Sequence, residues 1–451
     1  MIKNRMLKAL FCAAVVFHVF CFHPVWAQNS LNIPYSQFGL GLNNMPFNMP
    51  VAARLGGACY GLSTQNSLNP FNPASYGGIA TESFVFDMGL GIQYNTLSNS
   101  RDSRRYSDGN LSYLAAGLPL TKWWKMGLGL MPYTSVQYRS VTMQQGAGFD
   151  SVKTIYDGDG GVSQVFAGMA FNILGDGHNE GRRLQAGFNV NFLTGSVERA
   201  VTYSFRNIDS THYTNSQRYR KTSVSNVLLD FGLQYREPLG EKYTLGVDLV
   251  YKPHIKGTVK DDALIRTLHA SDQTSIDTIF PQSGQTAETE STLEQAGTVG
   301  IGVSLSRNRS WMAAFNATFG SWSGLKYTEG YTTSILGHGQ LASGPYRRYA
   351  LGLEKTGNMD ARTYWGRITW SAGLHVDQGA LYLNINGAKQ SVDAWGFGLG
   401  TSLPMRQGRS SLTFSLSYNS LGKKELLQYN SLMVGISVST CERWFAKRKY
   451  N

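Results

Sequence analysis

The sequence is poor in three features: charge, long apolar runs and cysteine. Charged residues are only 16% of the 451 residues. Beyond residue 27 no apolar run reaches the roughly 18 residues that a membrane helix requires. Only two of the four cysteines follow residue 27, Cys59 and Cys441. These shortages exclude a helical membrane protein and a disulfide framework, and they leave open whether the two cysteines pair.

The first 27 residues are typical of a secretory signal peptide. Basic residues stand at positions 3, 5 and 8, and an apolar stretch follows from Ala9 to Phe22. Val25-Trp26-Ala27 then forms a plausible cleavage site. We therefore expect a signal peptide over residues 1–27 and an exported mature chain.

Glycine and aromatic residues are abundant. The chain contains 50 Gly, 24 Tyr and 22 Phe. That composition is typical of a membrane β-barrel, which carries aromatic girdles and can have a glycine-lined interior.

Apolar and polar residues alternate after Gly78, which is the period of a β-strand. In the segment 84–94, Phe84, Phe86 and Leu90 share one face, while Asp87 and Gly89 share the other. The same alternation recurs at 184–192, 227–236, 243–252 and 431–439. Alternation alone fits both a soluble sandwich and a membrane barrel.

Loop lengths distinguish the two folds, because outer-membrane barrels have long outer loops and short periplasmic turns. Long polar connections follow most odd-numbered strands, and short turns such as 118–121 and 237–240 follow most even-numbered ones. We therefore predict an all-β fold, a transmembrane antiparallel barrel of about 14 strands over residues 80–440, with a periplasmic tail at 441–451. The strands are expected near 84–95, 110–118, 122–139, 161–172, 183–202, 222–236, 243–257, 293–306, 310–321, 346–355, 363–376, 391–404, 411–419 and 428–439. Residues 380–388 are assigned to an outer hairpin extension.

The segment before the first strand is too rich in Gly, Asn, Ser and Pro for a helix or a long strand. It reads RLGGACYGLSTQNSLNPFNPASYGG from Arg54 to Gly78. We predict that residues 28–79 form a plug, or hatch, inside the lumen.

This segment resembles the hatch of the FadL/TodX family of outer-membrane transporters for hydrophobic compounds, in a divergent branch. The resemblance lies in Gly56-Gly57 followed by Asn72-Pro73-Ala74 just before the first strand. The stretches 34–41 and 443–450 are also similar to that branch. The resemblance implies passive uptake of an apolar molecule, a lumenal pocket, and sideways exit through a distorted third strand.

Candidate site residues follow from the resemblance and from the plug. The lateral gate is predicted at Met131-Pro132-Tyr133, because proline cannot donate to a strand ladder. The alternative is a bulge near the strand end without a role in transport. The predicted ligand-binding and plug residues are Arg54, Leu55, Gly56, Gly57, Tyr60, Leu68, Phe71, Asn72, Pro73 and Ala74.

The sequence departs from the family in its lumen. Predicted inward positions are Gly, Asn, Ser, Thr, Gln and charged residues, so no apolar stripe defines a fatty-acid pocket. Plug side chains such as Leu62 and Tyr76 could supply apolar walls. Arg54 is a candidate cation for a ligand carboxylate, but an ion pair with a wall aspartate is the favoured interpretation.

An enzyme with its site on the outer rim of the barrel is the least favoured hypothesis. The histidines lack metal-ligand spacing, Asp157-Gly158-Asp159-Gly160 fails the EF-hand spacing, and no G-x-S-x-G element occurs. We predict no catalytic residue, no metal site, no cofactor and no nucleic-acid partner, and read the basic run 218–221 as loop charge near anionic lipid.

The resulting hypothesis is a cell outer-membrane channel for hydrophobic small molecules of fatty-acid or lipid-like type, in contact with outer-membrane lipid and lipopolysaccharide. The alternative is a FadL-like barrel that acts in protein interaction or secretion. Its partner would bind through outer loops at 101–108, 204–221 and 261–291.

Overall fold

The computed structural model describes residues 34–43, 48–100, 102–146, 149–175, 181–205, 214–269, 275–279, 288–307, 310–321, 325–327, 340–341, 344–385, 388–405 and 409–443. The predicted signal peptide, the first residues of the predicted plug and the tail beyond residue 443 lie outside this set.

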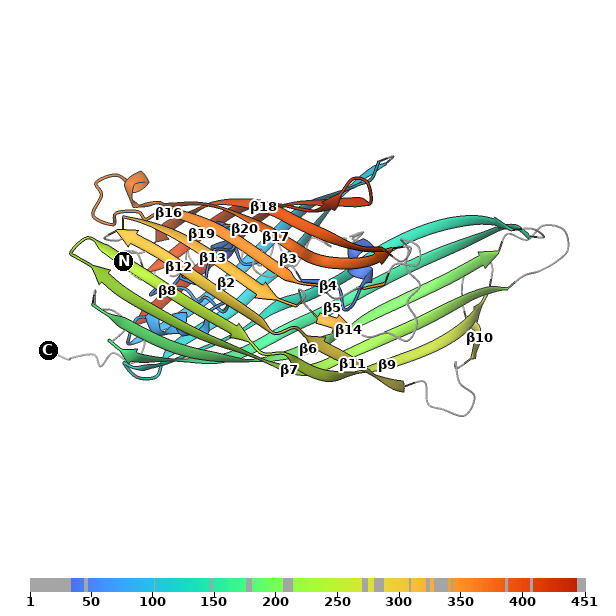
Figure 1. Ribbon diagram of the computed structural model, residues 1–451, viewed down its shortest axis with the longest axis horizontal. Coiled ribbons are helices and arrows are strands. Elements are labelled where there is room, and N and C mark those ends of the chain that lie inside the picture. Colours follow the sequence, from blue (N-terminus) through green and yellow to red (C-terminus); the bar gives the residue numbers. More distant parts are fainter. Residues whose placement is uncertain are drawn as a thin grey trace, which may run out of the picture. The chain divides into compact units, whose positions relative to one another are not determined.

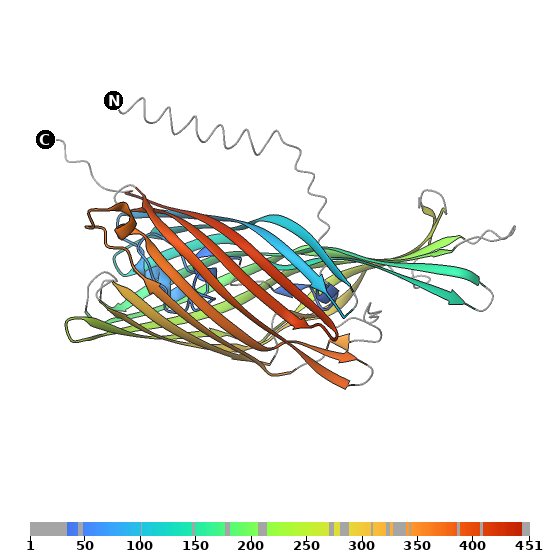
Figure 2. The ribbon, with the colours of Figure 1, turned by 90° about the horizontal axis from the view of Figure 1, so that it is seen from above.

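Fourteen antiparallel strands close into a barrel, as predicted (Figures 1 and 2). They are β2 to β8, β12, β13 and β16 to β20. The barrel closes where Ser83–Ser98 of β2 pairs with Gln428–Arg443 of β20. The bounds are η1 Pro34–Gln37, β1 Leu42–Asn43, α2 Pro50–Ala53, η2 Pro73–Gly78, β2 Ser83–Ser98, β3 Ser103–Pro119, β4 Trp124–Gly146, β5 Phe149–Leu174, β6 Arg183–Phe205, β7 Asn215–Leu239, β8 Tyr243–Lys252, β9 Ile255–Leu268, β10 Ser275–Ile279, β11 Glu288–Gln295, β12 Thr298–Arg307, β13 Trp311–Gly320, β14 Leu325–Tyr327, β15 Gln340–Leu341, β16 Tyr346–Lys355, η3 Tyr364–Arg367, β17 Thr369–Ile385, β18 Ala388–Met405, β19 Ser410–Lys423 and β20 Leu427–Arg443.

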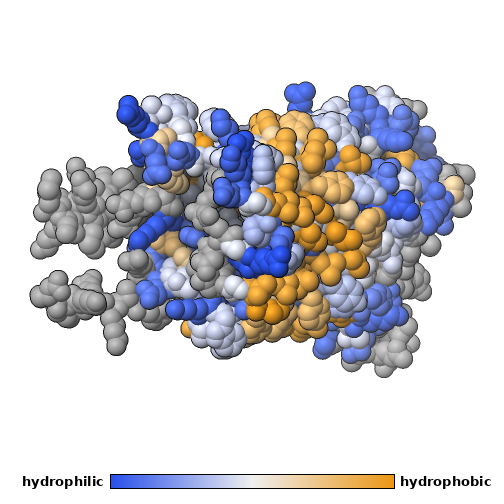
Figure 3. Space-filling model, turned by 60° about the vertical axis from the view of Figure 1, so that its left-hand side comes forward, coloured by the Kyte–Doolittle hydropathy of each residue, from blue (hydrophilic) through white to orange (hydrophobic). Residues whose placement is uncertain are grey.

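The outward face of the barrel is an apolar belt between two polar ends (Figure 3). Large side chains such as Ile92, Val190 and Leu374 are exposed there, whereas their polar neighbours in sequence point into the lumen. A closed sheet with such a belt satisfies every condition for a strand-built membrane protein. The protein is therefore an outer-membrane barrel. None of the described helices is long and apolar enough to cross a bilayer.

Several strands continue beyond the belt, which corrects the predicted outer loops. The pairs Gly146↔Phe149, Val152↔Phe205 and Asn215↔Leu268 show that β4 to β7 and β9 extend as one sheet past their neighbours (Figure 2). Most described residues of the predicted loops 101–108, 204–221 and 261–291 are therefore strand. The alternation fades there because both faces meet water, while backbone pairing continues.

The opposite end carries mostly short turns, as expected for the periplasmic side. Residues 120–123 and 240–242 connect strands there. A longer described connection, between β16 and β17, runs from residue 356 to residue 368. Residues 380–385 continue β17 and pair with β18, so the predicted outer hairpin extension is confirmed.

Residues 48–79, called the plug from here on, lie inside the barrel in its periplasmic half (Figure 1). Only short helical turns interrupt their irregular backbone. Residues 34–43, the N-terminal segment, lie nearer the outer end, where Leu42 and Asn43 pair with Ser135 and Thr134 of β4. Both pieces are almost wholly buried.

Cys59 and Cys441 do not form a disulfide bond, and both are buried. Cys59 lies in the plug, where burial raises the pKa of its thiol to about 12. Because a raised thiol pKa keeps the unreactive neutral form, Cys59 lacks a thiolate at neutral pH.

We expect Cys59 of a Cys441→Ser variant to resist maleimide from pH 7 to pH 9 in mild detergent. In the unfolded chain, labelling should accelerate over this range, because an unperturbed thiol titrates near pH 8.5. Mass spectrometry before and after unfolding checks the contrast. Rapid labelling of the folded variant at pH 8 would show that the plug does not bury this thiol.

Candidate functional site: the plug and the seam in the wall

The plug lies directly against wall backbone at many positions where the wall residue is glycine. A Cβ atom added at Gly373 would lie 2.1 Å from the Leu55 carbonyl carbon, and one at Gly232 would lie 2.1 Å from the Asn72 side-chain oxygen. We call the wall glycines whose added Cβ would lie within 3.0 Å of a plug atom the glycine seat. They are Gly117, Gly127, Gly168, Gly187, Gly232, Gly300, Gly352, Gly373, Gly398, Gly400 and Gly435.

The first turn of the plug needs glycine for its own backbone. After α2, Gly56 has φ +61° and Gly57 has φ +83°, a region that side chains with a Cβ disfavour. The Gly57 N–H donates to the Ala52 carbonyl and closes the helical turn. Leu55 is thereby held against Gly352 and Gly373.

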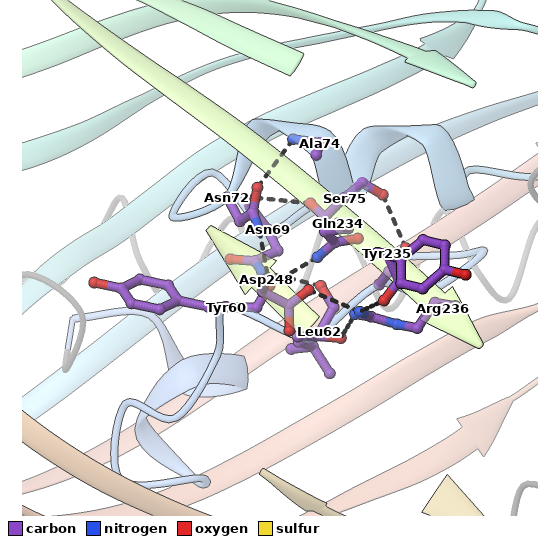
Figure 4. Close-up of polar contacts among 12 residues, drawn as sticks. Tyr60, Leu62, Asn69, Asn72, Ala74, Ser75, Gln234, Tyr235, Arg236 and Asp248 are labelled. Atoms are coloured by element: carbon purple, nitrogen blue, oxygen red, sulfur yellow. Dashed lines mark hydrogen bonds and ion pairs between the residues drawn. The ribbon is translucent and has the colours of Figure 1, made fainter. Parts of the chain in front are cut away.

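Wall side chains supply the hydrogen bonds that the irregular plug backbone cannot make for itself. Gln234 donates to the Tyr60 carbonyl at 2.7 Å, and Arg236 donates to the Gly61 carbonyl at 2.8 Å (Figure 4). Asn189 donates to the Pro70 carbonyl at 3.1 Å. Lys125 donates to the Ile79 carbonyl. The plug fold is thus completed by strands β4, β6 and β7.

In the Asn72-Pro73-Ala74 element, Asn72 caps the N-terminus of η2. The Asn72 side chain accepts from the Ala74 N–H and donates to the Tyr60 carbonyl (Figure 4). Pro73 starts η2, where its missing N–H costs nothing. The element packs on Gly187 and Gly232, which pair with each other in β6 and β7.

Arg54 forms an ion pair with Glu354 of β16, at 2.5 Å, so its partner is a glutamate rather than an aspartate. The same guanidinium donates to the Ser371 hydroxyl at 3.0 Å. The Arg54 side chain is 6% exposed and the Glu354 side chain is 12% exposed. Arg54 therefore fastens the plug to the wall.

The other predicted plug residues take structural positions as well. Tyr60 lies over Gly300, and its hydroxyl is 2.8 Å from that of Thr318. Leu68 packs against Gly117 and Gly127. Phe71 is partly buried and packs against the apolar cluster that contains Leu68. Together these contacts fix the plug to β3, β4, β12 and β13.

Charged residues predicted on inward positions pair within the wall. Arg236 lies 2.8 Å from Asp248, and Lys252 lies 3.6 Å from Asp230. Asp87 accepts from Tyr113 at 2.6 Å and from Ser439 at 3.0 Å. Arg367 instead lies in η3, outside the strands.

The wall has a seam between β3 and β4. The two strands pair only from Leu114↔Leu130 to Pro119↔Lys125. Beyond Leu130, β4 continues to Gly146 with β5 on one side, while β3 follows β2. On the seam side, the described partner of this part of β4 is β1, at Thr134 and Ser135.

Irregular backbone marks the start of the seam on both strands. In β4 the register shifts between Pro132 and Thr134, so Tyr133 is the bulged residue. In β3 the register with β2 also shifts. Tyr113 pairs with Gly89 and Leu111 pairs with Leu90, which leaves Ser112 as the bulged residue. Met131 and Tyr133 are buried. The three residues predicted as a gate thus stand at the edge of the seam.

An apolar cluster lies beside the seam, on the outer side of the plug, and sequence analysis missed it. It combines Leu40 of the N-terminal segment with inward residues of β4 to β7, β9 and β11. The signal was present, because the inward positions Asn189 and Asn191 continue to Leu193 and Val197. The cluster, called the outer apolar cluster, comprises Leu40, Tyr133, Val136, Tyr138, Val162, Leu193, Val197, Val224, Leu228, Val259 and Leu293.

The N-terminal segment closes the outer apolar cluster. Arg199 of β6 donates to the Gly39 carbonyl, next to Leu40. Tyr35 donates to the Leu427 carbonyl at 2.6 Å, and burial raises the pKa of its hydroxyl to about 12. Phe38 and Tyr35 fill a second apolar cluster near the β19–β20 turn.

Comparison with known proteins gives the family. A sequence profile of the BamG family matches residues 1–451. The chain belongs to the BamG family. A search of curated protein sequences found no relative.

Solved structures share the fold of this BamG-family protein. The Ralstonia pickettii toluene transporter TbuX superposes with a TM-score of 0.52 at 13% identity, covering 89% of this chain and 98% of its own. A Pseudomonas aeruginosa FadL homologue gives 0.51 at 14% identity, covering 90% and 99%. The predicted FadL-like barrel is confirmed.

A Cβ added at the glycine seat should displace the plug. We expect Gly373→Ala to cost about 1–3 kcal/mol of unfolding free energy, the usual range for overpacking. The variant should also show ion conductance in planar bilayers. Gly109→Ala is the control, because its nearest neighbour would be 3.9 Å from the new Cβ. Equal conductance of both variants would contradict a plug seated on backbone.

Removing one charge of the Arg54–Glu354 pair should destabilise the plug more than removing both. Glu354→Gln leaves a buried guanidinium without its carboxylate, a loss of about 3–5 kcal/mol. Combining it with Arg54→Met should recover part of that loss. Protease resistance of the plug in detergent ranks the stability of the variants. If the stability losses of the two single variants add up in the double variant, the two residues do not interact directly.

Proposed function

We propose that this BamG-family protein is a passive outer-membrane channel for hydrophobic small molecules of fatty-acid or lipid-like type. The observation that carries the proposal is the seam, where the β3–β4 ladder ends at Leu114↔Leu130 inside a closed barrel. An apolar molecule can leave sideways only where the wall lacks a complete ladder, and the seam is such a place.

The outer apolar cluster gives the route its entrance. It lies on the outer side of the plug and reaches the seam at Tyr133. In the present arrangement the Leu40 side chain occupies it. A ligand would enter from outside, replace Leu40 among the valines and leucines, and pass to the bilayer beside Pro132.

The plug forces this sideways route. The glycine seat and the wall hydrogen bonds leave the plug in direct contact with backbone around the lumen. TbuX, which shares the fold, is named as a toluene transporter, and toluene is apolar. The apolar belt would contact outer-membrane lipid and lipopolysaccharide, and we assign the protein no catalytic role.

A protein-interaction role is the second candidate. The outer extension of β4 to β7 and β9 favours it, because its β4 edge beyond Ser135 faces no described strand on the seam side. Purification in mild detergent separates the candidates. A retained lipid-like molecule supports transport, whereas a stoichiometric protein supports interaction.

Pro132→Ala should reduce uptake of an apolar tracer several-fold, because an N–H at this position allows the ladder to close. Pro404→Ala is the matched control, since Pro404 also lies in a strand but pairs with Ser411 of β19, away from the seam. Uptake is measured with a fluorescent fatty acid in intact cells. Unchanged uptake in Pro132→Ala would refute exit through the seam.

A further inference from the structure

A cavity of about 820 Å³ lies under the plug and opens at the end of the barrel that carries the short turns. Its inner wall is formed by plug residues 61–67 and its sides by the periplasmic ends of the strands. We call this cavity the vestibule. Because plug residues form its inner wall, it lies on the opposite side of the plug from the proposed transport route.

The lining of the vestibule is polar and carries positive charge. Hydroxyl side chains such as Ser63, Ser306 and Thr413 are frequent in it. Arg54 is neutralised by Glu354, and Arg236 by Asp248. Arg183, Arg367 and Arg409 also line the cavity, and besides Glu354 its acidic lining residue is Glu241. An apolar ligand gains little in such a space, whereas an anionic one is attracted.

The loop between β16 and β17 forms part of the rim and is held rigid by its own hydrogen bonds (Figure 1). The Asn358 N–H donates to the Gly366 carbonyl at 2.9 Å, and the Arg367 side chain donates to the Ala361 carbonyl at 2.9 Å. The Thr356 N–H donates to the Ser310 carbonyl of the neighbouring turn. The loop is a fixed projection.

This rigid loop exposes large apolar side chains. Trp365 is 73% exposed, and Met359 and Tyr364 are each 49% exposed. Trp370, which pairs with Lys355 at the start of β17, is an outward-facing residue of the apolar belt and is 48% exposed. Trp365 lies five residues further into the loop, beside the exposed Arg362 and Asp360. Tryptophan, tyrosine, methionine and arginine are the residues enriched at protein interfaces.

We propose that the periplasmic mouth is a docking surface for an acidic segment of a periplasmic protein. The segment's carboxylates would enter the vestibule toward Arg367 and Arg409, and an apolar groove on the partner would receive Trp365. The two halves of the surface are continuous, because Met359 and Arg367 belong both to the loop and to the lining of the vestibule.

The test is site-specific photo-crosslinking of the full-length protein in its own outer membrane. A photoreactive phenylalanine analogue replaces Trp365, and the matched control carries it at the belt residue Trp370. We expect a discrete protein adduct only at position 365, with the crosslinked peptide of the partner adjoining an acidic stretch. Arg409→Glu should lower the yield by about fivefold, the scale of one exposed charge contact.

Arg409→Gln gives a milder second variant, and Arg139→Glu at the outer end controls for net charge. Heat-modifiable gel mobility confirms that each barrel is folded. Lipid adducts alone at position 365, or no adduct, would assign the loop to the membrane interface and overturn the proposal. A protein adduct whose yield is unchanged in the Arg409 variants would also overturn the proposal. Tracer uptake should be unchanged in Arg409→Glu. The docking proposal and the transport proposal can therefore be refuted independently of each other.

Discussion

The structure depends on the direct contact between plug backbone and wall glycines. An irregular segment that is buried inside a barrel needs hydrogen-bond partners for its polar backbone groups. Here the wall approaches closely enough to do so because residues such as Gly187, Gly232 and Gly373 have no side chain to hold the plug away. Asn189, Gln234 and Arg236 then reach the plug carbonyls. A barrel with ordinary side chains at the seat would leave these carbonyls unpaired.

The plug divides the lumen into an outer part and a periplasmic part. On the outer side, the route that we propose runs from the outer apolar cluster through the seam to the bilayer and does not cross the plug. On the periplasmic side, the arginine-containing vestibule ends against the plug, so its charges face only the periplasm. The same plug thus lies between the apolar site that we propose for small molecules and the polar surface that we propose for a protein.

Much of the fold could be predicted from the sequence, because each strand repeats a simple period. Phe86, Leu90 and Ile92 point outward and Asp87 inward, as alternation requires. Strand ends were harder, since the extended sheet of β4 to β7 and β9 loses its alternation where lipid ends. The outer apolar cluster was missed for a related reason. The bulge at Tyr133 shifts the inward set of β4 to Val136 and Tyr138, and no rule of period two anticipates the shift.

By itself, the sequence determined the class of the protein: a strand-built membrane barrel with a glycine-rich segment before it, and a proline at the point where one ladder would be weakened. These features are local or periodic, so they can be predicted from residue type and spacing. Only the tertiary structure decided which residues meet. It paired Arg54 with Glu354, placed Leu40 in the outer apolar cluster, and ended the β3–β4 ladder at Leu130. Such contacts join residues tens to hundreds of positions apart, and barrel closure alone brings them together.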